Sequence, residues 1–265
     1  MDAADRIPVL MYHRIGEIYH PAERRYCVTP DRFDAQMSFL ARRGYRAVPI
    51  EALVAWLENG SPLCEGDFVL TFDDGYKGVL DYAAPVLDRL NWPFTVFLVT
   101  DLLGQCDAWP RNDGSDSAAH PLLTADDVVS MAARGVSFHS HTCRHRSLRT
   151  LDDDTLRHEL MASRDALRQL LGTGDHYIAY PYGHVDDRVA RAARESGYTA
   201  GFSVRSGFNR TDVDRFRIRR LDVAGTDTPA ALLRKMKMGS NDGSRRAALR
   251  YMTQRLADRL RFHTA

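Results

Sequence analysis

Short apolar runs alternate with amphipathic helical patterns along most of this chain, and that alternation constrains its fold more than any other feature. The runs with the length and the β-branched and aromatic content of strands are residues 8–12, 45–48, 67–72, 94–99, 135–138, 177–180, 198–203 and 216–221. The helical patterns between them start at Pro30 and end before Gly44, or cover residues 50–58, 78–90, 125–133, 152–171, 187–195 and 229–237.

Such alternation predicts an α/β fold, in which a parallel sheet is covered by helices as either a barrel or an open doubly wound sheet. Both architectures gather chemically active side chains where the strands end at their carboxyl side. We expect one domain over residues 1–238 of the 265-residue chain.

The composition is that of an ordinary globular protein, with 44% hydrophobic and 27% charged residues. A formal net charge of +1 argues against nucleic-acid binding. The N-terminus is acidic and its apolar run is too short for a signal peptide or a membrane span, which predicts a cytoplasmic protein. The four cysteines contain no CxxC pair, so neither a disulfide framework nor a zinc ribbon is indicated.

Residues 239–265 form a separate segment, predicted as a flexible GSNDGS linker followed by a basic helix. Helical spacing places Leu249, Met252 and Leu256 on one stripe. The helix is strongly cationic through Arg245, Arg246, Arg250, Arg255, Arg259 and Arg261. It would pack on the domain, form oligomer contacts, or make peripheral contact with anionic lipid.

The longest stretch without periodicity is residues 103–123. It predicts a loop over one rim of the sheet, either a substrate lid or a surface insertion. Its Trp109 is a candidate substrate-binding side chain.

Two adjacent carboxylates, Asp73 and Asp74, follow the strand at 67–72 directly. Neighbouring carboxylates repel each other, and a divalent cation is the simplest agent that keeps both ionised. One would then bind the cation and the other would be free for proton transfer. The alternative is a solvated acidic turn.

Three histidines, His139, His141 and His145, follow the strand at 135–138 within seven residues. If the chain turns helically there, the HxxxH spacing places His141 and His145 on one face. Two imidazoles and one carboxylate leave open positions on zinc, cobalt, nickel or iron. We therefore predict Asp74, His141 and His145 as ligands and His139 as a supporting residue, with Cys143 pointing away from them.

The run at 177–180 ends in the turn Pro181-Tyr182-Gly183. Pro181 and Gly183 shape a loop that could aim the backbone N–H of Tyr182 at a developing oxyanion. An ordinary structural turn is the alternative.

Together these stretches resemble the polysaccharide deacetylase family, which is also known as carbohydrate esterase family four or the NodB-homology domain. Residues 71–75 match its TFDDG motif, residues 141–145 match H-[S/T]-x-x-H, and residues 181–183 match the P-Y-G that ends its third motif. The resemblance covers roughly residues 6–238 and implies a distorted (β/α) barrel of about seven parallel strands.

The family resemblance also implies a function, namely metal-dependent hydrolysis of an N-acetyl or related acyl group on an amino sugar. Carried onto this chain, it makes Asp73 the general base. Asp74, His141 and His145 would hold one divalent metal ion, expected to be zinc, with cobalt or nickel as alternatives. The Tyr182 N–H would help to bind the oxyanion.

The chain departs from the family pattern at two places. Where many members carry an arginine oriented on the catalytic aspartate, this chain has Ala179, and Arg220 is our candidate replacement. The general-acid histidine of the C-terminal part is also missing, because His263 follows no predicted strand.

The first strand suggests a substitute for that histidine. It ends in Tyr12-His13, which is similar to the YH element near the start of the poly-N-acetylglucosamine deacetylase branch. We therefore assign His13 as the general acid, with Asp222 as a candidate for orienting a histidine. A purely structural role is the alternative for His13.

The competing functions are a non-catalytic metal- or glycan-binding module on the same fold, and an O-acetyl esterase or deformylase of the same family. A phosphoryl-transfer enzyme is disfavoured, because the chain lacks DxDxT spacing and a glycine-rich phosphate loop. The expected substrate is an N-acetylated saccharide, and a cytoplasmic location would favour a lipid-linked or nucleotide-linked sugar.

Overall fold

The computed structural model describes residues 3–109, 119–172, 174 and 176–262, with side chains described to residue 254. At its centre lies a sheet of β1 (Val9–Tyr12), β4 (Arg46–Ala47), β5 (Asp67–Phe72), β6 (Thr95–Leu98), β7 (Ser137–Ser140), β8 (Tyr177–Ala179), β9 (Ala200–Phe202) and β10 (Leu221–Asp222). The strand order is β10, β1, β5, β6, β7, β8, β9, with β4 pairing with β5. Every pairing is parallel, as the alternation of strands and helices predicted.

The two edges of this sheet are joined by the segment that leads into β10. Ile218 forms a parallel bridge with Phe202 of β9, and three residues later β10 pairs with β1. The curled sheet is therefore the predicted distorted (β/α) barrel. The prediction of one strand over 216–221 was wrong, because this segment divides its backbone hydrogen bonds between two edges instead of following one.

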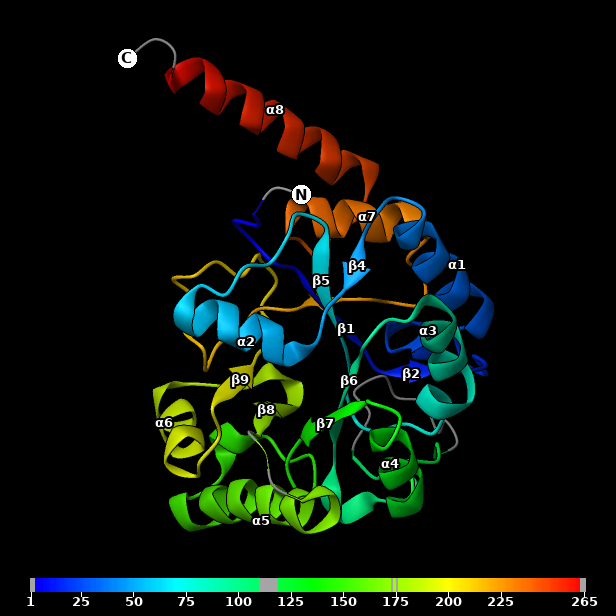
Figure 1. The fold of residues 1–265 in the computed structure, drawn as a ribbon, viewed down its shortest axis with the longest axis vertical. Helices are drawn as coiled ribbons and strands as arrows, with labels where there is room; N and C mark the ends of the chain where they lie inside the picture. Colours follow the sequence, from blue (N-terminus) through cyan, green and yellow to red (C-terminus); the bar gives the residue numbers. More distant parts are fainter. Residues whose placement is uncertain (1–2, 110–118, 173, 175, 263–265) are drawn as a thin grey trace.

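Helices surround the sheet, as Figure 1 shows. They are α1 (Pro30–Ala41), α2 (Ile50–Asn59), α3 (Ala84–Leu90), α4 (Ala125–Ala132), α5 (Asp153–Leu171), α6 (Asp187–Glu195) and α7 (Pro229–Met238). A further helix, α8 (Arg245–Phe262), follows α7. A small parallel pair, β2 (Arg14–Ile15) with β3 (Cys27–Val28), follows β1. Among the described residues, no helix combines the length and the apolar character that crossing a membrane requires.

The helix predicted over 78–90 is interrupted. Residues Val79–Ala83 form a wide π-type turn, and α3 begins only at Ala84. Pro85 explains the break, because its nitrogen has no hydrogen to donate to the preceding turn and its ring crowds the carbonyl there. The helix predicted to end before Gly44 ends at Ala41, and residues 42–44 form the turn that follows it.

Alternating residues of a strand pack in two different hydrophobic clusters, one on each face of the sheet. On β5, Phe68, Leu70 and Phe72 are buried in a cluster with residues of α1 and α3. Val69 faces the opposite side and packs in a second cluster, which includes Phe97 and residues of α2. Because successive strand side chains point to opposite faces, these two clusters set the register of the sheet. That register fixes which side chains reach the rim.

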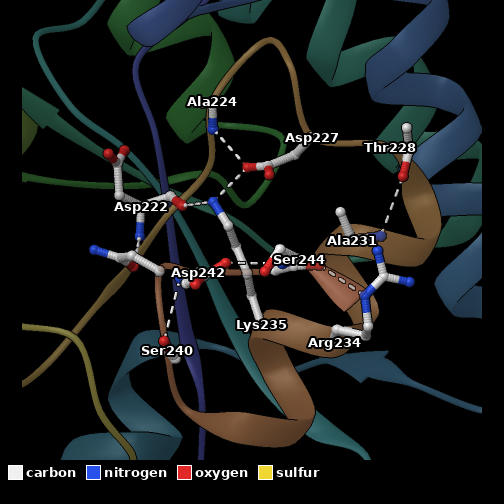
Figure 2. Close-up of polar contacts among 12 residues, drawn as sticks. Asp222, Ala224, Asp227, Thr228, Ala231, Arg234, Lys235, Ser240, Asp242 and Ser244 are labelled. Atoms are coloured by element: carbon white, nitrogen blue, oxygen red, sulfur yellow. Dashed lines mark hydrogen bonds and ion pairs between the residues drawn. The ribbon is translucent and has the colours of Figure 1, made fainter. Parts of the chain in front are cut away.

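The segment after α7 is bonded to the domain, in contrast to the flexible linker that the sequence predicted. The Asp222 amide of β10 donates to Asn241 Oδ1 at 2.9 Å, and Arg234 Nε donates to the Gly243 carbonyl at 2.7 Å. Lys235 Nζ donates to the Asp222 carbonyl at 2.9 Å (Figure 2). From this bonded segment α8 extends away from the barrel beside α7 (Figure 1).

Candidate metal centre and active site

The predicted site residues follow the carboxyl ends of neighbouring strands. His13 follows β1, Asp73 and Asp74 follow β5, and His141 follows β7. The Asp73 amide donates to the Tyr12 carbonyl at 2.9 Å, and the His141 amide donates to the Leu98 carbonyl at 2.7 Å. Each strand therefore ends while still bonded to its neighbour, which holds these side chains at one rim.

Asp74, His141 and His145 meet at this rim. Asp74 Oδ1 lies 3.3 Å from Nε2 of each histidine, and all three residues are buried. Asp74 Oδ1 is buried with no hydrogen-bond partner among the described residues. A divalent cation would supply that partner, and one carboxylate oxygen with two imidazole nitrogens suits zinc and its neighbours. The residues present therefore fit a metal centre.

The ring of His141 is oriented by the backbone. Its Nδ1 lies 2.7 Å from the carbonyl oxygen of Ala179, which can only accept a hydrogen bond. Nδ1 must therefore carry a hydrogen, and Nε2 is directed at the Asp74 carboxylate. The position where other family members carry an arginine thus contributes its carbonyl group to ligand orientation.

Local charge adjusts the proton affinity of this group. Burial alone would raise the pKa of Asp74, but the neighbouring histidines lower it to about 2. Burial alone would lower the pKa of His141, but Asp73 and Asp74 raise it. Burial dominates at His145 and lowers its pKa to about 4. Of the two histidines, His141 therefore holds a proton more readily than His145.

His141 and His145 come together through an irregular loop. The helical turn that the HxxxH spacing predicted is not present there. Thr142 and His145 both adopt left-handed backbone conformations, with φ of 68° and 56°. Asp74 has φ of 74° at the opposite side of the group. Its neighbour Gly75 packs so closely on Leu98 that a Cβ would lie 2.7 Å from Leu98 Cδ2. These unusual conformations are concentrated where the ligands converge.

Asp73 makes a two-point ion pair with Arg220. Nη1 donates to Oδ1 at 2.6 Å and Nη2 donates to Oδ2 at 2.7 Å, and both side chains are buried. Burial would raise the pKa of Asp73, but the guanidinium of Arg220 lowers it below its ordinary value. Arg220 is thus the arginine that contacts Asp73 in this chain, although it comes from a different strand end than the family motif.

His13 and Asp222 lie at adjacent strand ends. The ring of His13 packs edge-on against Tyr26 with centroids 5.2 Å apart, and its Nδ1 is buried without a hydrogen-bond partner among the described residues. Asp222 pairs in register with Met11, two residues before His13. Its Oδ1 is likewise buried without a described partner. The orientation of His13 by Asp222 stays a prediction.

Aromatic rings enclose His145. Trp109 lies against it with ring centroids 4.4 Å apart, and Tyr182 packs edge-on at 4.7 Å. Tyr182 has φ of 58° within the 3₁₀ turn Pro181–Gly183. A Cβ at Gly183 would lie 2.2 Å from Val204, so only glycine fits this turn. The third motif and the loop containing Trp109 thus form one wall of the site.

His139 lies one pleat deeper, within β7 itself. Its Nδ1 accepts the Tyr177 amide at 3.3 Å, and its Nε2 lies 3.0 Å from Ser137 Oγ. Nε2 is also 3.6 Å from Glu51 Oε1 of α2. His139 lies outside the cluster of metal-ligating atoms, which consists of Asp74, His141 and His145.

Glu159 is a residue of the site region that was not predicted from the sequence. This buried residue of α5 accepts hydrogen bonds from the amides of Cys143 and Arg144, inside the loop between the two histidine ligands. A signal was available, because the helical pattern places this glutamate among the buried residues Leu156, Leu160 and Leu167 of the same helix.

Comparison with known proteins supports the interpretation from geometry. The family described as polysaccharide deacetylase matches residues 61–201. The poly-β-1,6-N-acetyl-D-glucosamine N-deacetylase of Staphylococcus epidermidis is 25% identical over 213 residues, which cover 76% of this chain and 69% of that protein. YxkH of Bacillus subtilis is 27% identical over 220 residues, covering 83% and 72% of the two chains.

A solved structure agrees with both matches. The Streptococcus pyogenes deacetylase PplD, determined in complex with acetate, superimposes with a TM-score of 0.75 and 27% identity, covering 89% of this chain and 99% of its own. The Staphylococcus epidermidis relative is named as a polysaccharide N-deacetylase and the Streptococcus pyogenes structure as a deacetylase, and the barrel with its three matched motifs agrees with both. The chain belongs to the polysaccharide deacetylase family.

Proposed function

We propose that this protein removes the N-acetyl group, or a related acyl group, from an amino sugar in a glycan or glycoconjugate. The observation that carries the proposal is the ionised Asp73, paired with Arg220, beside the Asp74, His141 and His145 group. A proton acceptor adjacent to a site for a Lewis acid is a combination that can hydrolyse an amide.

In this proposal Asp74, His141 and His145 hold one divalent ion, with zinc expected and cobalt or nickel as alternatives. The bound ion would polarise the acyl carbonyl and lower the pKa of the attacking water. The buried, unpartnered oxygen of Asp74 supports the assignment.

The residues of the chain divide the proton transfers. Asp73 accepts a proton from the water as its oxygen bonds to the acyl carbon, and Arg220 keeps that carboxylate ionised beforehand. The Tyr182 N–H, which donates to no backbone acceptor in the described chain, would donate to the oxyanion. His13, oriented by Asp222, donates a proton to the nitrogen as the carbon–nitrogen bond breaks. The products are a carboxylate and a free amine.

We propose an N-acetylglucosamine-containing glycan as the substrate class. The support comes from the Staphylococcus epidermidis relative, which is named for poly-β-1,6-N-acetyl-D-glucosamine, and from the Bacillus cereus relative, which is named for peptidoglycan N-acetylglucosamine. The exposed edges of Tyr26 and Tyr182 beside the site offer surfaces on which a sugar ring can pack.

The experiment that tests this function is acetate release from a panel of substrates. The panel contains β-linked N-acetylglucosamine oligomers, peptidoglycan fragments, lipid-linked and nucleotide-linked N-acetyl sugars, O-acetylated xylan and N-formyl sugars. Protein stripped of metal by a chelator and then reloaded with zinc, cobalt or nickel is compared with the untreated protein. We expect release from N-acetylated sugars that is lost on stripping and restored on reloading.

Other outcomes would change the proposal. Activity that survives complete stripping would refute the metal centre. Turnover confined to O-acetylated or N-formylated substrates would assign an esterase or deformylase. A non-catalytic binding module was suggested by the missing motif arginine, and the Arg220–Asp73 pair removes that motive.

We also propose that α8 makes peripheral contact with anionic lipid. Leu249 and Met252 are 65% and 67% exposed on this helix. They lie among the exposed side chains of Arg245, Arg246 and Arg250. Apolar side chains flanked by arginines suit the boundary between lipid headgroups and acyl chains.

A further inference from the structure

The loop between the two histidine ligands, residues 141–145, has a partner for every backbone amide. His141 N–H donates to the Leu98 carbonyl, Thr142 N–H to Ser140 Oγ, and His145 N–H to Thr142 Oγ1. The two amides between them, those of Cys143 and Arg144, both donate to Glu159. Each residue of this irregular loop is thus fixed by a hydrogen bond from its backbone amide. The carboxylate of Glu159 accepts the two hydrogen bonds at the middle of the loop.

Glu159 is suited to that task by its position. Its Oε2 accepts the Cys143 amide at 3.0 Å and the Arg144 amide at 3.1 Å. The side chain is 2% exposed and lies on the inward face of α5. A second contact comes from its backbone, whose carbonyl oxygen lies 3.5 Å from Cys143 Sγ. Hydrogen bonds to an ionised acceptor are stronger than neutral ones, especially when buried.

The backbone of this loop needs such support. Thr142 and His145 hold left-handed conformations that non-glycine residues adopt only when their surroundings enforce them. Cys143 and Arg144 lie between those two residues. Releasing their amides would let the loop relax toward ordinary conformations and move His145 away from Asp74.

We infer that Glu159 is a positioning residue for the metal centre, which sets the separation of the His141 and His145 imidazoles through the backbone of the loop. This inference rests on the proposed function, because it assigns a purpose to the spacing of the two predicted ligands. Glu159 touches neither ligand side chain nor substrate in this role. Its effect is therefore expected in metal affinity before it is expected in stability.

Three variants test the inference. Glu159→Ala removes both hydrogen bonds. Glu159→Gln keeps one carbonyl oxygen, which can accept both amides as Oε2 does now. Leu167→Ala, on the same helix and fully buried, is the matched control for lost packing. For each, zinc affinity is measured by competition with a chelating dye, and thermal unfolding of the stripped protein is measured alongside.

We expect E159A to weaken zinc binding by about tenfold or more, the range seen when supporting partners of metal ligands are removed. E159Q should stay close to the wild type. L167A should unfold at a lower temperature and bind zinc normally. Zinc affinity of E159A equal to that of the wild type would overturn the role of Glu159 alone, whereas wild-type protein that binds no zinc would overturn the metal centre as well.

Discussion

Arg220 and Asp73 form a buried, two-point ion pair although they are 147 positions apart in the chain. Nη1–Oδ1 and Nη2–Oδ2 distances of 2.6 and 2.7 Å match the fork of a guanidinium to both oxygens of a carboxylate. Arg220 Nε also donates to the Ser203 carbonyl at 3.0 Å, which fixes the guanidinium plane. The segment that closes the barrel thereby orients the proposed catalytic base.

Replacing Arg220 with methionine should shift the acidic limb of the pH–kcat/KM profile to higher pH. The carboxylate is the active form of Asp73, and Arg220 holds its pKa below 3.8 against the effect of burial. Without the guanidinium, burial raises that pKa, so the base becomes protonated at a higher pH. The variant should also lose about 3–5 kcal/mol of unfolding free energy near neutral pH, because a buried charge loses its partner.

Arg219 provides the matched control for this variant, because it is adjacent in the chain and exposed. R219M should leave both the pH profile and the denaturant midpoint unchanged. An acidic limb at the same pH in R220M and in the wild type would exclude Arg220 as the group that keeps Asp73 ionised.

Asp73→Asn and Asp74→Asn should separate proton transfer from metal binding. D73N keeps the shape of the side chain but removes the base, so acetate release should fall by about 10²–10⁴-fold while zinc binding persists. D74N removes the only carboxylate in the ligand group and should lose zinc affinity first. Both quantities are measured on the same preparations, and unchanged turnover in D73N would contradict its role as base.

Much of the fold was predictable from the sequence because local and global signals agree. Of the strands that carry the site, β1, β5, β6 and β8 fall within the predicted apolar runs, and parallel pairing follows from their alternation with helices. The run predicted over 135–138 overlaps β7 only in part, because that strand continues to Ser140. The predictions fail where a single residue, or pairing with a strand far away in the sequence, determines the backbone conformation. Pro85 interrupts one predicted helix, and the segment after Phe216 divides its hydrogen bonds between two edges.

The grouping of Asp74, His141 and His145 was also predictable, because the carboxyl ends of neighbouring parallel strands share one rim. The route by which His145 reaches that rim was not, since two left-handed residues replace the expected helical turn. Arg217, Arg219 and Arg220 are equivalent candidates in the sequence, and only the fold turns the last of them inward. The role of a buried carboxylate such as Glu159 can be assigned only once the structure shows which amides donate hydrogen bonds to it.

Zinc binding by the stripped protein should release protons at mildly acidic pH. Asp73 and Asp74 raise the pKa of His141 above its ordinary value despite its burial, so His141 holds a proton at higher pH than a free imidazole does. His145, with its pKa lowered to about 4 by burial, is already neutral. A ligating imidazole must be neutral, so the proton on His141 has to leave.

Calorimetric titration with zinc in buffers of different ionisation enthalpy measures this release. The observed heat should vary with the buffer at mildly acidic pH and progressively less as the pH is raised and His141 loses its proton before zinc is added. Heats that are independent of the buffer at the lower pH would show that His141 carries no proton in the metal-free protein.

His13→Ala should affect amides more than activated esters. The proposed acid protonates a departing amine, whereas 4-nitrophenolate leaves without a proton. Hydrolysis of N-acetylglucosamine oligomers should therefore fall by about 10²–10⁴-fold, with a much smaller loss on 4-nitrophenyl acetate. H20A, at an exposed histidine, is the control and should leave both rates unchanged. Equal losses of H13A on both substrates would contradict the role as acid.

Glutamates at Leu249 and Met252 should abolish binding of the protein to anionic vesicles. These side chains are 65% and 67% exposed, and burying each in a lipid interface contributes up to about 1.5–3 kcal/mol. Co-sedimentation is measured with vesicles of phosphatidylglycerol and phosphatidylcholine, and with phosphatidylcholine alone. The wild type should sediment only with the anionic vesicles and should be released by salt, because the arginines of α8 supply the attraction.

The matched control places a glutamate on an exposed apolar residue of the barrel, as V129E. That variant should sediment like the wild type, since α4 contains no arginine and carries Asp126 and Asp127 in its first turn. Acetate release from a soluble oligomer should be the same in all three proteins. Equal sedimentation of wild type and L249E/M252E would show that α8 does not contact the lipid, and oligomer contacts would then be the remaining use of its exposed apolar side chains.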